Sequence, residues 1–177
     1  MKTLRSLAAA TVLVGGVTLA SGVASSVVSA TTVKNCLAAH LRVSVGQSQG
    51  TAGTIYYPIV FTNAGPACAL WGAPAIQPVV GGPTHSHVAV GPAARYLNMG
   101  AMPVRHVIAT GKSVSGAFGV SESGNYTPSL CGAKTAHAIV VTLAGFVPSR
   151  YLPLTISVCT KRTSTTTRLL VAGTTGY

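Results

Sequence analysis

The amino-acid sequence predicts an all-β fold, a single antiparallel immunoglobulin-like β-sandwich with two disulfides. Three features favour this class: runs of alternating apolar and polar residues, turn-forming residues between the runs, and an even number of Cys residues. Alternation with a period of two gives a strand one apolar face, and two sheets can bury such faces against each other. No long segment shows the period of about 3.6 residues that marks an amphipathic helix.

The expected strands follow from apolar residues that recur at every second position. The apolar faces are, in chain order: Leu41, Val43 and Val45; Ile55, Tyr57, Ile59 and Phe61; Val114, Phe118 and Val120; Ile139, Val141 and Leu143; Leu152, Leu154, Ile156 and Val158. With two further runs, the strands are expected at residues 41–46, 54–62, 104–109, 113–120, 138–143, 152–158 and 168–172. Segments rich in Gly, Pro and Asn separate these runs, and the polar run Thr163–Thr167 is expected to be a hairpin turn.

The N-terminal segment has the pattern of a secretory signal peptide. Lys2 and Arg5 precede an uncharged stretch over residues 7–28, and Val28 and Ala30 place small residues at the −3 and −1 positions of a cleavage site. Cleavage after Ala20 or Ala24 is an alternative. Residues 1–30 are therefore expected to be removed, leaving one β-sandwich domain over residues 31–177, exported to the cell wall or the medium and without a transmembrane segment.

The four Cys residues all lie in the expected secreted domain, where an even number indicates disulfides. Three pairings are open, and Cys36–Cys68 with Cys131–Cys159 is favoured because it closes two loops of moderate length. Each bridge should stabilise the fold by roughly 2–4 kcal/mol. A zinc site is disfavoured, because no two Cys residues have the CxxC spacing.

The near absence of acidic residues excludes several classes of enzyme. The chain has one acidic side chain, Glu122, whereas paired-carboxylate glycosidases and aspartic proteases need two and two-metal phosphoryl-transfer sites need several. A Ser-His-Asp triad would have to use Glu122 in place of the Asp. We therefore expect no catalytic residues. With so few carboxylates to protonate, we also expect the fold to persist in strongly acidic medium.

The number and spacing of the basic residues indicate which classes of partner to expect. Of twelve Lys and Arg, Lys2 and Arg5 lie in the leader, so the domain carries ten positive charges and one negative, a net charge of +9. Only Lys161 and Arg162 are adjacent, and a nucleic-acid binder would cluster its basic residues and interleave aromatic ones. We expect no nucleic-acid partner, a weak and salt-sensitive attraction to anionic wall polymers or lipid surfaces, and a monomer.

Several segments carry a resemblance to a known family. They are Cys36, LRVSVG at 41–46, GTIYYPIVFTN at 53–63, CALWGAP at 68–74, Val90-Gly91, Thr110-Gly111, Cys131 and Val158-Cys159. From about Cys36 to the C-terminus the chain resembles a secreted actinobacterial family, the domain of unknown function numbered four-two-three-two. The resemblance implies an all-β secreted domain and supplies no catalytic residues. Ala73 stands where the family usually has Tyr, and Trp71 stands at a commonly polar position.

His and Met residues suggest one specific chemistry. His85 and His87 would lie on one face of an extended segment, and Met99, Met102 and His106 follow. Imidazole with thioether is a ligand set that suits copper, so a copper-binding carrier is the alternative function. Met also fills gaps in ordinary cores, which favours a domain with no cofactor.

Trp71 is expected to be an exposed contact residue, with packing on the disulfide of Cys68 as the alternative. The favoured function is a secreted, non-catalytic β-sandwich that binds a ligand or partner at the cell envelope or outside the cell. A hydrolase that uses Ser and His without Asp ranks behind both this function and the copper carrier.

Overall fold

The computed structural model describes residues 32–83 and 86–177, so the expected signal peptide lies outside the described residues. The described part contains thirteen strands, two 3-10 helices and one short α-helix. In chain order they are η1 (Ala38–His40), β1 (Leu41–Val45), β2 (Gln49–Thr51), β3 (Thr54–Asn63), β4 (Cys68–Leu70), β5 (Ala75–Val80), β6 (Val88–Ala89), β7 (Arg95–Tyr96), β8 (His106–Ile108), β9 (Ser113–Ser121), η2 (Ser123–Asn125), α1 (Pro128–Cys131), β10 (Ala133–Leu143), β11 (Val147–Cys159), β12 (Thr165–Thr167) and β13 (Val171–Ala172).

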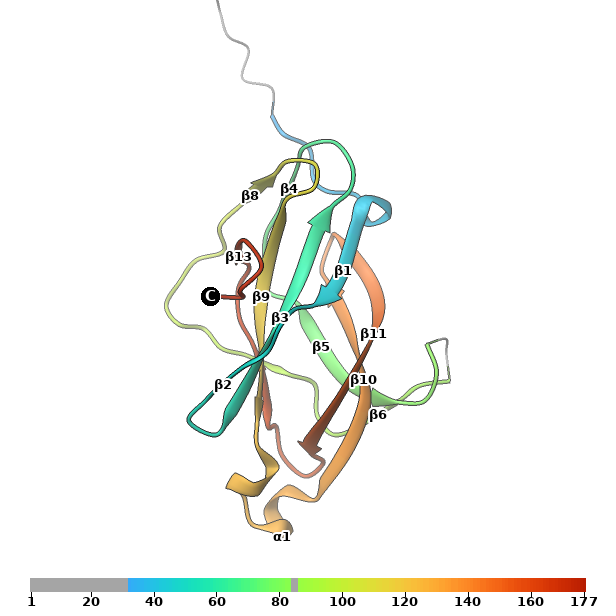
Figure 1. Cartoon of the computed structure of the whole chain (residues 1–177), viewed down its shortest axis with the longest axis vertical. Coiled ribbons are helices and arrows are strands. Elements are labelled where there is room, and N and C mark those ends of the chain that lie inside the picture. The colour runs from blue at the N-terminus through green and yellow to red at the C-terminus, as the bar shows by residue number, and fades with distance from the viewer. Residues whose placement is uncertain (1–31, 84–85) are drawn as a thin grey trace, which may run out of the picture. The chain divides into compact units, whose positions relative to one another are not determined.

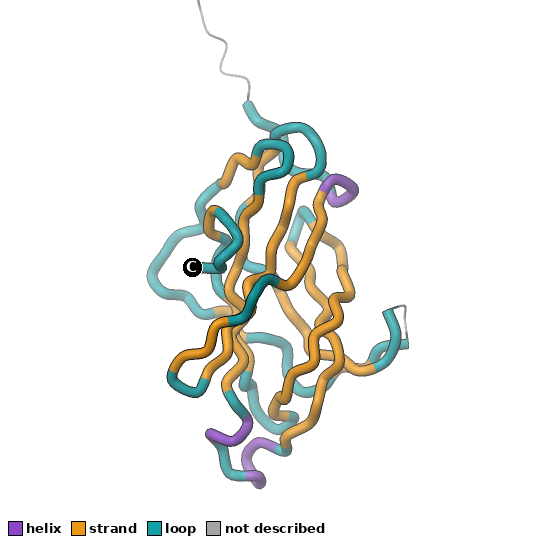
Figure 2. Tube along the Cα trace, in the orientation of Figure 1, coloured by secondary structure: helices purple, strands orange, loops and turns teal. Residues whose placement is uncertain are grey.

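Two sheets face each other and form a β-sandwich (Figure 1). The larger sheet has the order β1-β3-β9-β12-β7, with β2 paired to β3 and β13 paired to β9. The smaller sheet has the order β11-β10-β5-β6, and β4 and β8 form a separate pair. Figure 2 shows that the helical turns are confined to the segment before β1 and the connection between β9 and β10. The predicted all-β sandwich is therefore confirmed.

The core forms where the apolar faces of the two sheets meet. Ile59 and Phe61 of β3, Phe118 of β9, and Ile139 and Val141 of β10 are completely buried. The alternation that predicted these strands is the cause, because it turns large apolar side chains of both sheets toward one another. Burial of each such side chain contributes roughly 1.5–3 kcal/mol.

The outer face of strand β9 is covered by the C-terminal segment, residues 173–177. Ser115 Oγ donates to the carbonyl of Gly173, and the backbone N–H of Gly176 donates to Ser115 Oγ, both over 2.9 Å. Gly176 lies against Ala117, since a Cβ at Gly176 would be 3.3 Å from the Ala117 Cα atom. Small residues on this face of β9 therefore let the segment lie directly on the sheet.

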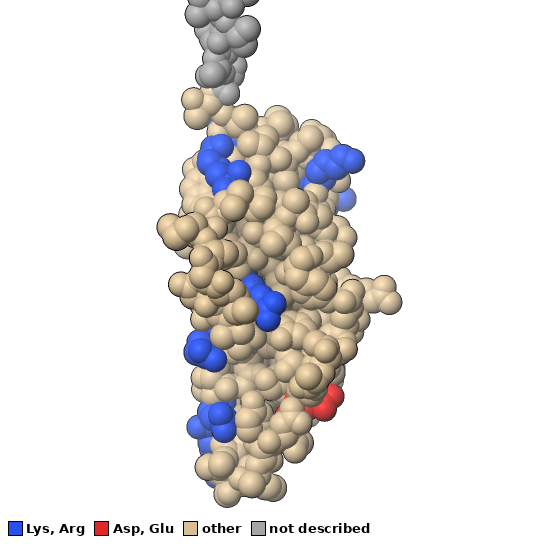
Figure 3. Space-filling model, turned by 90° about the vertical axis from the view of Figure 1, so that its left-hand side faces the viewer, with Lys and Arg blue, Asp and Glu red and all other residues tan. Residues whose placement is uncertain are grey.

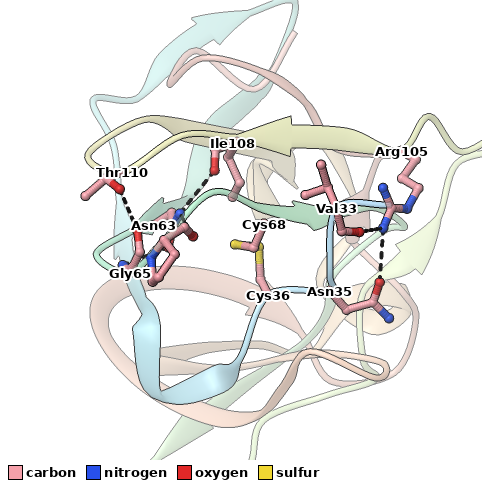
Figure 4. Close-up of a disulfide and its surroundings, with 10 residues drawn as sticks. Val33, Asn35, Cys36, Asn63, Gly65, Cys68, Arg105, Ile108 and Thr110 are labelled. Atoms are coloured by element: carbon pink, nitrogen blue, oxygen red, sulfur yellow. Dashed lines mark hydrogen bonds between the residues drawn. A yellow bond between two sulfur atoms is a disulfide. The ribbon is translucent and has the colours of Figure 1, made fainter. Parts of the chain in front are cut away.

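Both predicted disulfides are present. Cys36–Cys68 ties the segment before β1 to β4, and Cys131–Cys159 joins the end of α1 to the end of β11. Figure 4 shows the first bridge beside the loop that Asn63 organises. The buried Asn63 amide donates to the carbonyls of Pro66, over 2.8 Å, and Ile108, over 3.1 Å. Covalent and polar links thus fix the same end of the domain.

The end of the chain differs from the prediction. Thr165–Thr167 is strand β12 instead of a hairpin turn, and it pairs antiparallel with β9 and parallel with β7, so one pair departs from the expected antiparallel pattern. The run 168–172 is not one strand: only Val171 and Ala172 pair, again with β9. The reason is that the Leu170 N–H bonds to the Gly72 carbonyl instead of a ladder partner.

The other expected strands are present, with different lengths. Several further strands were not expected. β10 and β11 begin earlier than predicted, and their pairing contains two irregularities in register. The run 104–109 contributes only β8, His106–Ile108. The unexpected strands are short or carry little alternation: β2, β4, β5, β6 and β7.

Candidate functional site

The strongest candidate site is a hollow on the outer face of the larger sheet, next to the C-terminal segment. We call it the arginine hollow. Its volume is about 300 Å³, and it lies where the β2–β3 hairpin meets the chain after β12. The residues that line it are Gln49, Gly50, Thr51, Tyr56, Arg168 and Tyr177.

Strand register explains why these residues meet. Tyr56 of β3 lies opposite Gln49 of β2 and opposite Gly119 of β9, and Gly119 lies opposite Thr166 of β12. Residues opposite one another in paired strands share a face of the sheet, so these four form one row across it. Arg168 lies two residues beyond Thr166, with its N–H bonded to the Ala117 carbonyl of the neighbouring strand.

Gly119 provides the floor on which the Tyr56 ring lies. A Cβ atom at Gly119 would be 2.6 Å from Thr166 Oγ1 and 3.0 Å from Tyr56 Cε1, both closer than ordinary contact. The ring therefore lies directly over the glycine backbone. A glycine inside a strand marks such a close approach, and here it lets an aromatic ring lie flat beside the hollow.

Arg168 is the charged group of the hollow. Its Cζ atom is 5.2 Å from the centroid of the Tyr56 ring, within range of a cation–π interaction. Its Nε atom is buried and has no hydrogen-bond partner, and no acidic group pairs with it within residues 32–83 and 86–177. Arg168 as a whole is half-buried and lines the hollow, so its other N–H groups are the donors open to an acceptor from outside the chain.

Tyr177 closes the other side of the hollow. Its ring meets the Tyr56 ring edge-to-face, with centroids 6.3 Å apart and planes at 85°. Its hydroxyl donates to Gln49 Oε1, which links the C-terminal segment to β2. Figure 3 views the molecule from this side and shows basic side chains spread over the face, one of them between neutral residues near its centre.

The structure does not bring the expected copper ligands together. His85 lies outside the described residues. The His87 ring packs near Tyr151, with centroids 6.3 Å apart, whereas His106 Nε2 donates to the Leu170 carbonyl over 2.9 Å. Strand β6, which follows His87, and strand β8, which begins with His106, lie far apart in Figure 1.

The two Met residues of the expected copper site are both exposed. Met99 and Met102 are 69% and 81% exposed in the connection between β7 and β8. In the part of the chain that the structure describes, no group of three or more His, Cys, Asp or Glu residues is placed to hold a metal ion. Copper binding therefore remains a prediction from the sequence alone. Met99 instead lines a second cavity beside the arginine hollow.

Trp71 is half-buried instead of exposed. Its ring meets the Phe146 ring edge-to-face, with centroids 4.5 Å apart, and the Arg105 guanidinium lies 5.4 Å from its centroid. Arg105 is held there by the carbonyl of Val33 and the side chain of Asn35 (Figure 4). The ring thus packs partly within the domain, against Phe146 and Arg105, and the contact role of Trp71 stays a prediction.

A comparison with protein families identifies the domain. The model of a domain of unknown function, DUF4232, matches residues 36–173. The chain belongs to this family. No curated protein and no solved structure matches it. The matched range of the DUF4232 domain includes all four Cys residues and every residue that lines the arginine hollow except Tyr177.

The arginine hollow of this DUF4232 domain was not found from the sequence. The sequence places Arg168 only as the first residue of the predicted strand 168–172. The one signal in the sequence is Tyr56, an aromatic residue on the polar side of an alternating strand.

None of the helices within residues 32–83 and 86–177 has the length and apolar character that a membrane span requires.

Proposed function

We propose that this DUF4232 domain is a secreted, non-catalytic module that binds a small organic anion in the arginine hollow, at the cell envelope or outside the cell. The observation that carries the proposal is the half-buried Arg168 guanidinium, which lines the hollow and forms no ion pair within residues 32–83 and 86–177. A hydrogen bond to a charged group contributes about 1.5–3 kcal/mol, and a bound carboxylate or phosphate that accepts from the other N–H groups of Arg168 would add such bonds.

The geometry favours an anion over other ligands. The Tyr56 ring lies 5.2 Å from the Arg168 Cζ atom, and a guanidinium carries N–H donors whose geometry matches the two oxygens of a carboxylate or phosphate. The chain's only acidic side chain, Glu122, lines a different cavity, together with Tyr57 and Ser157, and cannot occupy the hollow. The net charge of the domain would also raise the concentration of anions at its surface.

Two further observations support a secreted, non-catalytic role. The two disulfides are typical of an oxidising compartment outside the cytosol. The polar side-chain groups that line the hollow are hydroxyls, an amide and one guanidinium. A guanidinium stays protonated and does not serve as a general base, so this set is suited to binding an anion.

The test is titration of the purified domain with sodium acetate and inorganic phosphate at constant ionic strength. The Arg168 Nε–Hε resonance in ¹H–¹⁵N spectra should shift saturably, with dissociation constants in the millimolar range. Arg162 is the matched control, because it stacks on Tyr126 at 4.3 Å but is exposed and lines none of the cavities described here.

The variants Arg168→Lys and Arg162→Lys separate a site from general attraction. We expect Arg168→Lys to weaken binding at least tenfold, because Lys cannot reproduce the planar pair of donors. Arg162→Lys should leave binding unchanged. Resonance shifts of equal size at Arg168 and Arg162 during the titration would contradict the proposal. So would shifts that added chloride abolishes equally in Arg168→Lys and in Arg162→Lys.

A further inference from the structure

We infer that the ligand of the arginine hollow is an amphiphile, an anion that carries a short apolar chain or ring. This inference rests on the proposed anion binding and names the ligand's chemical class. A second cavity, of about 190 Å³, adjoins the hollow, and Arg168 and Tyr177 line both of them. The guanidinium is therefore placed where a charged head group would end and an apolar part would begin.

The two cavities differ in chemistry. Gln49, Thr51 and Tyr56 give the hollow polar groups on the side away from the second cavity. The second cavity, which we call the apolar cavity, has few polar groups. Its lining residues are Tyr96, Leu97, Met99, Ala101, Arg168, Leu169, Val171, Gly176 and Tyr177.

Exposure of the apolar lining is the second observation. Tyr96 is 41% exposed and Met99 is 69% exposed, although both line the same cavity. A ligand chain in this cavity would cover apolar surface that water now contacts, and each fully buried methylene contributes about 0.8 kcal/mol. Met suits such a wall, because its unbranched side chain adapts to ligands of different shape.

Two hydrogen bonds order the segments that form the walls of the apolar cavity. The Leu97 N–H donates to the Thr167 carbonyl over 2.9 Å, which joins the start of the loop to β12. The Gly100 N–H donates to Asn98 Oδ1 over 2.9 Å and shapes the turn that carries Met99 and Ala101. The cavity is therefore formed before a ligand arrives.

The volume limits the size of the apolar part. A water molecule occupies about 30 Å³ of liquid, so the apolar cavity holds about six groups of that size. The fitting ligands are aliphatic or aromatic acids and phosphate monoesters with about six carbon atoms. Carboxylate and phosphate head groups share the chemistry that a guanidinium recognises.

The experiment is a series of titrations with straight-chain carboxylates from acetate to octanoate, and with hexyl phosphate as a second head group. We expect the dissociation constant to fall about two- to fourfold for each added methylene, up to about six carbons, and then to level off. A fourfold fall is the value expected when each added methylene is completely buried.

Two variants test where the apolar chain of the ligand binds. Ala101→Leu adds volume at the wall of the apolar cavity, so acetate binding should be unchanged while the advantage of hexanoate falls at least fivefold. Ala133→Leu is the matched control, an exposed Ala at the start of β10, and should change neither ligand. Thermal midpoints of both variants confirm that they are folded.

The outcomes separate this inference from the proposed function. Arg168-dependent binding that is equal for acetate and hexanoate would overturn the amphiphile and leave the anion site standing. Loss of all Arg168-dependent binding would overturn both. Chain-length dependence that persists unchanged in Ala101→Leu would place the apolar chain of the ligand elsewhere and overturn the inference.

Discussion

Replacement of Gly119 by Ala tests how the sheet builds the candidate site. An Ala in the interior of a strand normally stabilises by about 0.5–1 kcal/mol relative to Gly, because it loses less backbone entropy on folding. Here the new Cβ would be 2.6 Å from Thr166 Oγ1 and 3.0 Å from Tyr56 Cε1, where ordinary contact begins at 3.4 Å. Overpacking of this kind costs about 1–3 kcal/mol.

The expected net effect of Gly119→Ala is a loss of about 1 kcal/mol in the free energy of unfolding. For a domain of this size that loss lowers the thermal midpoint by about 2–4 °C. Because the Tyr56 ring must move away from Arg168, we also expect acetate binding to weaken severalfold. Differential scanning calorimetry and the acetate titration measure the two effects on the same protein.

Two further variants decide whether the close contact is the cause. Gly50→Ala, in β2, is the control for stability, since a Cβ there has open space, and its midpoint should stay level or rise. Thr166→Ala removes the nearest atom and should recover part of the loss when combined with Gly119→Ala. A midpoint that rises in Gly119→Ala as in Gly50→Ala, or that Thr166→Ala does not improve, would refute the reasoning.

Three other predictions concern the stability of the domain. Replacing Cys131 and Cys159 by Ser opens a bridge between residues 28 positions apart and should cost about 3–4 kcal/mol, measured by denaturant unfolding; a loss below about 1 kcal/mol would contradict this. Burial raises the pKa of Tyr57 above its usual 10.0. The stability that this raised pKa gives the fold is complete at pH values below the pKa of Tyr57 in the unfolded chain. It is lost as the pH rises through the pKa of Tyr57 in the folded protein. Unfolding free energy should therefore fall more steeply above pH 10 in the natural protein than in Tyr57→Phe, and parallel curves would argue against it. Glu122 forms no ion pair with any described residue, so thermal midpoints in moderate salt should change little between about pH 5 and 3; a steep fall there would mean that a carboxylate holds the fold.

The sequence by itself determined the class of the fold and its covalent links. The alternation in segments such as 41–46 and 54–62 defines two-faced strands, and a strand shifted by one residue would expose its apolar side chains. The pairing Cys36–Cys68 and Cys131–Cys159 followed from the spacing of four Cys residues, because loops of moderate length are readily closed. The strands depend on residues near one another in the chain, and the disulfides join residues 32 and 28 positions apart.

The tertiary structure alone decided the candidate site. Thr165–Thr167 has no apolar alternation and becomes a strand because β9 and β7 offer hydrogen-bonding partners on both sides. That pairing brings Arg168 beside Tyr56, and burial of Ser115 under the C-terminal segment brings Tyr177 to the same place. Local alternation tells which way a side chain points, but it does not tell which strands become neighbours. Neighbours are chosen by packing and hydrogen bonding over the whole domain. The β2–β3 hairpin brings Gln49 and Tyr56 together locally, but Arg168 and Tyr177 reach the arginine hollow only through long-range contacts.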